Sequence, residues 1–304
     1  MTTAAITSNT FREAVRQPVY WAIILLTAVL MCLSVVFVGF ALGEESKFVR
    51  DAGLTSITIA GLLMAMFLSS SVVADEIEKK TALSVLCKPV GRSEFIFGKF
   101  LGIVLAIIAG YIILTLLFLV TVWWFESQVQ YLMLFKFYGQ PLNARWISTD
   151  FFIDSPLHGQ PITLSMIASL FWSDVSGFVV SPLPNLAKGV ALSLCEVTVL
   201  AAAALAVSTR LSMIFNACLT LGLFILGHQI GYLVHSLTGS QTALGAKIVL
   251  AIVPNFELLN YASDIAFDKV VPMHLVGFLA LYTVGWIGVF LLAAIALFDQ
   301  REIA

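Results

Sequence analysis

Residues 100–125 read FLGIVLAIIAGYIILTLLFLVTVWWF, a run in which no side chain carries a charge. A helix needs about 20 apolar residues to cross the hydrocarbon core of a bilayer, which is roughly 30 Å thick. Inside that core a single segment must satisfy its own backbone polar groups, and only a helix does so. Trp123 and Trp124 end the run where interfacial aromatic residues belong. This stretch therefore predicts a transmembrane helix.

Five other apolar runs resemble this one in length and composition. Together the runs predict six transmembrane helices, at about 20–42, 54–74, 100–125, 189–209, 211–237 and 270–298. Of the 304 residues only 11% are charged and 60% are hydrophobic, whereas soluble domains have roughly 25% charged residues. Because so little charge cannot cover a water-facing globule, most of the surface must face lipid. We expect an all-α integral membrane protein with a single transmembrane domain over residues 1–304.

The charge distribution bears on orientation and on partners. Lys and Arg are denser in the connections on the side of the N-terminus, which predicts a multi-pass protein of the inner or plasma membrane with both termini in the cytoplasm. The formal net charge is −2, so no basic excess is available to neutralise phosphates, and we expect no nucleic-acid partner.

No pattern in the sequence predicts catalysis. A Gly-x-Ser-x-Gly elbow, a His-Glu-x-x-His helix and a Walker A loop are all absent from it. The four cysteines lie singly, and the histidines have no matching cluster of carboxylates or cysteines. We therefore expect no catalytic residue, no cofactor and no metal site.

Two long connections lie on the predicted outer side, at 126–188 and 236–271. Each contains an apolar stretch that is too short to span a bilayer, at 161–172 and at 248–256. We expect the first stretch to be a helix that lies in the interface or on the outer face. The second is interrupted by Pro254, which favours half-helices or a re-entrant segment.

The most distinctive polar segment lies on the predicted inner side, between the second and third runs. Residues 75–99 read DEIEKKTALSVLCKPVGRSEFIFGK. The acids come first and pair with the following lysines at i,i+4, in the order that stabilises a helix. Pro89 then ends this helix, and Ser93 can cap the next one. The pattern predicts a short, rigid cytoplasmic helix, which serves either as a solvated connector or as a docking element.

A few polar residues lie within the apolar runs. Glu196 is the only acid among them, and an acid in a membrane helix is costly. It either lines a pathway or pairs across a dimer, or it is an interfacial acid near the outer end of its run. His228 and Gln229 either contact a substrate or hydrogen-bond to other helices, and Asn216 is expected to form an interhelical hydrogen bond.

Short patterns recur in order along nearly the whole chain. The inner segment carries Glu76-x-Glu78-x-x-Thr81, Leu86-x-x-Pro89-Val90-x-Arg92 and Gly98-Lys99. The others are Phe11-Arg12-Glu13-Ala14-x-Arg16, Gly227-His228, Val253-Pro254-Asn255-Phe256 and Arg301-Glu302. This ensemble resembles the type-2 ABC transporter permeases, which are six-span membrane subunits of exporters whose ATPase is often a separate chain. The sequence departs from many relatives at Lys80, where they have glycine.

The resemblance implies a mechanism and partners. Residues 76–86 would form a coupling helix that inserts into a groove of an ABC ATPase subunit. The residues implied in this contact are Glu76, Glu78, Thr81, Leu86, Pro89 and Arg92. An amphipathic interface helix would precede the first span, and a second permease copy would complete a homodimer or heterodimer embedded in membrane lipid.

Two alternatives stay open at the level of sequence. A secondary transporter driven by an ion gradient would favour broken helices with charges at mid-membrane, and the runs here are mostly unbroken and free of charge. A membrane anchor or regulatory subunit that does not transport would use the same docking chemistry.

Overall fold

The computed structural model describes residues 2–40, 45–78, 91–137, 175, 178, 182–232 and 253–299, and the regular secondary structure within these ranges is helical. The helices are α1 (Thr2–Arg16), α2 (Pro18–Val36), η1 (Phe37–Phe40), α3 (Glu45–Glu78), α5 (Arg92–Phe137), α7 (Pro182–Ser208), α8 (Met213–His228), α11 (Ala262–Ala266) and α12 (Met273–Asp299). The expected all-α class is confirmed for this part of the chain.

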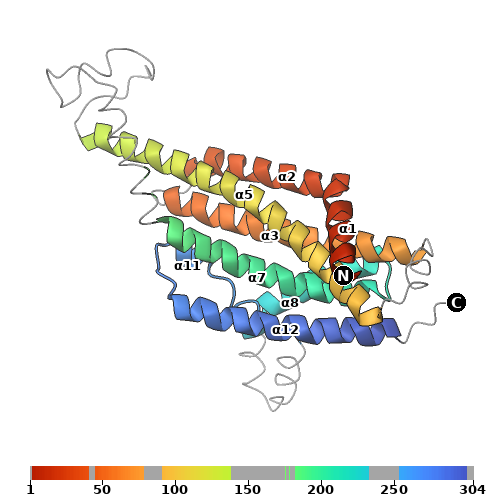
Figure 1. Ribbon diagram of the computed structural model, residues 1–304. Helices are drawn as coiled ribbons and strands as arrows, with labels where there is room; N and C mark the ends of the chain where they lie inside the picture. The colour runs from red at the N-terminus through yellow and green to blue at the C-terminus, as the bar shows by residue number, and fades with distance from the viewer. Residues whose placement is uncertain are drawn as a thin grey trace.

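The long helices α2, α3, α5, α7 and α12 run lengthwise through one bundle, and α1 crosses it at one end (Figure 1). The end of α3, the start of α5 and the end of α12 lie at the same end of the bundle as α1. We call this the α1 end. The opposite end, called the α11 end, holds α11 and the starts of α3, α7 and α12.

Five helices are long and apolar enough to cross a membrane. They cover Pro18–Val36, Glu45–Ser71, Ser93–Ser127, Pro182–Ser208 and Met273–Asp299. The chain is therefore a multi-pass membrane protein, and five of the six predicted spans correspond to these helices.

The remaining predicted span, 211–237, differs from the expectation of one uninterrupted helix. Helix α8 has 16 residues, which gives a length of about 24 Å at 1.5 Å per residue, less than the roughly 30 Å of a hydrocarbon core. Residue 229 forms a bend, and residues 230–232 are helical again. The carbonyl of Gly227 at this helix end accepts a hydrogen bond from the backbone N–H of Phe256, at 3.1 Å.

Helices α3 and α7, like α5, begin well before the apolar runs predicted, and charged residues near the starts of α3 and α7 have partners in other segments. Helix α3 starts at Glu45 and not near residue 54, and it includes Arg50, which forms ion pairs with acids of other segments. Helix α7 starts at Pro182, since proline is tolerated in the first turn. Lys188 of α7 donates to the carbonyl of Val271 at 2.8 Å.

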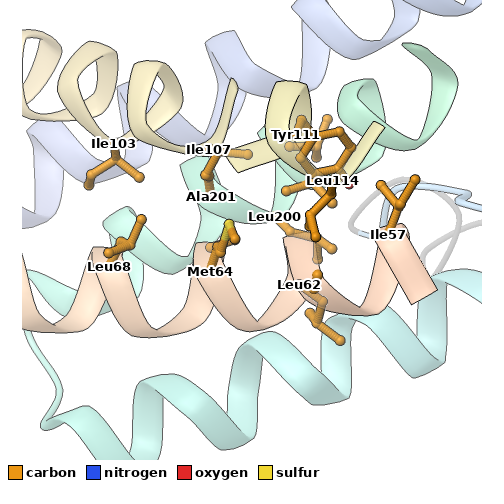
Figure 2. Packing of buried hydrophobic residues seen from close by; sticks show 14 of the residues in the cluster. Ile57, Leu62, Met64, Leu68, Ile103, Ile107, Tyr111, Leu114, Leu200 and Ala201 are labelled. Atoms are coloured by element: carbon orange, nitrogen blue, oxygen red, sulfur yellow. The ribbon is translucent and has the colours of Figure 1, made fainter. Parts of the chain in front are cut away.

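The core lies where α3, α5 and α7 meet (Figure 2). Met64 of α3 faces Ile107 of α5, Leu68 of α3 faces Ile103 of α5, and all four side chains are buried. On α7, the small residues 201–204 are all alanine and buried. Such residues allow neighbouring membrane helices to approach closely, so α7 is enclosed by its neighbours.

Several predicted features lie outside the described residues. These are the stretch 161–172, the connection 79–90 and Arg301-Glu302, together with most of the stretch 248–256.

A helix does precede the first span, and α1 packs on the start of α5, where the Thr7 hydroxyl donates to the carbonyl of Gly98 at 3.2 Å. That α1 lies in the membrane interface stays a prediction.

Candidate functional site

Glu196 lies deep inside the bundle. It is on α7, roughly 21 Å along the helix from Pro182 at 1.5 Å per residue, and it is 2% exposed. The earlier start of α7 places this acid about midway along a transmembrane helix. The structure therefore places this acid inside the bundle, and that it lines a pathway or pairs across a dimer stays a prediction.

His228, the last residue of α8, lies beside Glu196. Its Nε2 is 3.4 Å from Oε1 of Glu196. Its Nδ1 is 3.1 Å from the carbonyl oxygen of Phe224, and since a carbonyl only accepts, Nδ1 carries a proton. In the neutral ring Nε2 is then an acceptor, which can pair with Glu196 only when the carboxyl group or the ring is protonated. Oε1 of Glu196 is buried and has no hydrogen-bond partner among the described residues, which makes it a costly atom to bury.

A chain of hydroxyl groups runs beside Glu196 and links three helices. The Tyr111 hydroxyl on α5 is 2.9 Å from Oγ of Ser193 on α7, which is 2.8 Å from Oγ1 of Thr58 on α3. Thr58 Oγ1 donates to the carbonyl of Leu54 at 3.1 Å. When the Thr58 proton is on that carbonyl, Ser193 donates to Thr58 and Tyr111 donates to Ser193. In this arrangement the protons of all three hydroxyl groups are used.

A small cavity lies between α3, α7 and residues 259–262. Its volume is about 10 Å³, close to the least that holds one water-sized group. Ser193 and Glu196 are buried in its wall, whereas Asn260 is exposed, so the cavity opens on the side of Asn260. The lining residues are Leu54, Thr58, Gly189, Ser193, Glu196, Leu259, Asn260, Tyr261 and Ala262.

Residues 253–256, which lead into this wall, are fastened to α8 and α12. The Phe256 ring is fully buried, with its centroid 6.1 Å from that of His228. A Cβ on Gly227 would lie 2.3 Å from the Phe256 ring, so the absence of a side chain there allows the close approach. The N–H of Asn255 donates to the Tyr282 hydroxyl at 2.7 Å. Two patterns that the sequence presented separately, Gly227-His228 and 253–256, therefore pack together.

An ionic cluster lies at the α11 end of the bundle. Arg50 of α3 donates from Nε to Oε1 of Glu126 on α5 at 2.7 Å, and its Nη1 pairs with Asp268, which follows α11. Asp268 has a φ of 58°, a left-handed conformation that aspartate tolerates better than most residues. The cluster ties α3, α5 and the connection between α11 and α12 to one another.

The implied coupling residues are described only in part. Glu76 and Glu78 belong to the last turn of α3, and Arg92 is the first residue of α5. Residues 81, 86 and 89, which are Thr81, Leu86 and Pro89, lie outside the described ranges. In the ranges given above, no group of three or more His, Cys, Asp or Glu is placed to hold a metal ion.

The structure joins Glu196 to His228 but not to Gln229, which is exposed at the end of α8. Sequence reasoning missed the other cavity residues, because a neutral hydroxyl or amide in an apolar run has no distinctive pattern. One signal was available, since Ser193 and Glu196 are three residues apart and so share a helix face.

Comparison with known proteins gives one family assignment. The family model described as "ABC-2 family transporter protein" matches residues 4–303, which is nearly the whole chain. No curated protein matches it significantly.

Proposed function

The chain belongs to the ABC-2 family of transporter proteins and is thus a membrane permease of an ABC transporter; on that premise we propose that it exports a substrate by using ATP hydrolysed on a separate ATPase chain. Two permease copies would form the pathway and expose it alternately to each side of the membrane. Each copy would be one permease domain in the plasma membrane, with both termini in the cytoplasm. The sequence contains no Walker A loop, so in this proposal the phosphate-binding loop is the partner's.

The continuity of α3 carries the proposal. The apolar run ends at Ala74, but the helix continues without a break to Glu78. Its 34 residues correspond to about 51 Å of helix. The implied coupling residues Glu76 and Glu78 therefore lie on a stiff extension of a core helix, at the α1 end, where α5 also begins (Figure 1).

Helix α3 also contacts the two sites described above. Thr58 joins the hydroxyl chain at the cavity, and Arg50 forms the ionic cluster at the α11 end. Helix α3 contains no proline, which is one cause of sharp kinks, so a displacement at one end can be carried along the helix. An ATPase that pushes on residues 76–86 would therefore displace the cavity wall and the α11 end together.

The proposal is tested by co-expressing the chain with its ABC ATPase subunit and measuring co-purification and ATP turnover. The variant Glu76→Lys with Glu78→Lys reverses two charges on the extension. We expect it to lose ATPase association by about tenfold or more, because like charges or unpaired buried charges at an interface cost several kcal/mol. Glu45→Lys with Glu257→Lys makes the same charge change away from this extension and should leave association unchanged.

Two outcomes contradict the proposal. If both charge-reversed variants retain association and ATP turnover, residues 76 and 78 do not couple the chain to an ATPase. If the purified chain moves a substrate along a proton gradient without ATP, it is a secondary transporter.

A further inference from the structure

We propose that the cavity beside Glu196 is a binding site for one ammonium-sized cation, held by the Glu196 carboxylate and the hydroxyl oxygens of Ser193 and Thr58. The site lies between α7, α3 and residues 259–262, with its opening beside Asn260. It goes beyond the transport function proposed above, which would hold without it.

The hydrogen-bonding groups of the cavity wall favour a bound group that donates hydrogen bonds. Ser193 and Thr58 have already used their protons in the chain that ends at Leu54. A carboxylate offers only acceptors. Around Glu196 the wall therefore presents lone pairs of Ser193, Thr58 and the carboxylate, while the amide of Asn260 lies at the opening, and the matching guest is one that donates several hydrogen bonds. An ammonium group has this character.

The charge of the wall selects a cation. Glu196 is 2% exposed. The ion pairs that Lys and Arg form in the described ranges are made with other acids, and none is made with Glu196. His228 Nε2 lies 3.4 Å from Oε1 without a hydrogen bond, and it forms an ion pair with the carboxylate only when the ring is protonated. A buried acid without a donor gains most from a small positive partner that fits beside it.

The volume of the cavity, which is open on one side, restricts the guest to a small group. About 10 Å³ admits a single group the size of a water molecule, so a quaternary ammonium is too large. A free monovalent cation fits whole. A primary ammonium also fits if its substituent points out past Asn260, and in that case the site would recognise the amine end of a transported substrate, which rests on the proposed function.

The test measures equilibrium binding of radiolabelled methylammonium to the purified full-length chain in lipid nanodiscs, without ATP or ATPase. We expect saturable binding that Glu196→Gln weakens by about tenfold or more, since charged hydrogen bonds are the stronger kind. Ser193→Ala should weaken it several-fold. Glu257→Gln removes an exposed carboxylate outside the cavity and should leave binding unchanged. Gel filtration and thermal unfolding show whether each variant is folded.

Competition separates the two sources of the cation. Equal competition by ammonium and sodium indicates a site for a free ion, whereas competition by primary amines alone indicates the amine end of a substrate. Tetramethylammonium should not compete, and if it competes as well as ammonium, the argument from size is wrong. The inference is overturned if no saturable binding is found, or if wild type and Glu196→Gln bind equally. If ATPase co-purification is intact in that case, the proposed transport function stands.

Discussion

Replacing Arg50 by methionine should destabilise the chain far more than neutralising Asp268, although both are members of one ionic cluster. Arg50 is 9% exposed and bonds to Glu126 through Nε at 2.7 Å and through Nη2 at 2.5 Å. The Glu126 side chain is 22% exposed, whereas that of Asp268 is 68% exposed. The Arg50–Glu126 pair is therefore shielded from water and the Arg50–Asp268 pair is not.

The magnitudes follow from this difference in exposure. Removing one member of a fully buried ion pair costs about 3–5 kcal/mol, because the other member keeps its desolvation cost without its partner. Glu126 retains some access to water, so we expect a loss of about 2–4 kcal/mol for Arg50→Met. Asp268→Asn should cost at most about 1 kcal/mol, as for exposed ion pairs. In Arg50→Met with Glu126→Gln no charge is stranded, and the loss should be smaller than for Arg50→Met alone.

The assay is thermal unfolding of the purified chain in nanodiscs, followed by the fluorescence of its six tryptophans. Lys269→Met is the matched control, because it removes a cation that is 69% exposed and pairs with Asp264 at 2.6 Å. The reasoning is refuted if Arg50→Met unfolds at the same temperature as Lys269→Met. It is also refuted if the double variant is less stable than Arg50→Met.

Two further substitutions test other contacts, each by the same thermal unfolding measurement. Gly227→Ala would place a Cβ 2.3 Å from the Phe256 ring and should cost about 1–3 kcal/mol by overpacking. In the control Gly222→Ala, on the same helix, the new Cβ meets nothing within 4 Å and should not destabilise the chain. Equal effects of the two substitutions would contradict the packing argument. Asn216→Ala removes the hydrogen bond from the buried Asn216 Nδ2 to Ser70 Oγ at 2.7 Å and should cost about 1–2 kcal/mol, and an unchanged unfolding temperature would show that this contact does not tie α8 to α3.

The apolar runs predicted the membrane helices well because a segment that crosses lipid must be both apolar and long enough to span the hydrocarbon core. They failed at the ends of α3 and α7, where Arg50 and Lys188 lie inside helices. A charged residue ends a hydropathy run, but it does not end a helix when an acid or a carbonyl from another segment pairs with it. Such partners are distant in the sequence, so a pattern in one run cannot reveal them.

The candidate site was predictable only through its charged member. Glu196 stood out because an acid in a membrane helix is costly, and His228 because it is polar in an apolar run. Thr58 and Tyr111 belong to other runs, and nothing in their own neighbourhoods indicates that they meet at Ser193. The bend at residue 229 was missed for the same reason, since the contact of Phe256 with Gly227 joins distant parts of the chain.

The contacts around the cavity indicate which of its walls opens. Its helical walls are tied by the hydroxyl chain from Tyr111 through Ser193 to Thr58, and α3, α5 and α7 share a buried apolar core (Figure 2). Residues 253–261 have no regular helix or strand, and their bonds to the helices include one from Phe256 to Gly227 and one from Asn255 to Tyr282. Separating the helices would strip apolar contacts along their length, whereas lifting the segment breaks a few hydrogen bonds and exposes only Pro254, Phe256 and Leu259 among its buried residues. A cation should therefore enter past residues 253–261, and a motion of α3 should reach the cavity by displacing Thr58 beneath that segment.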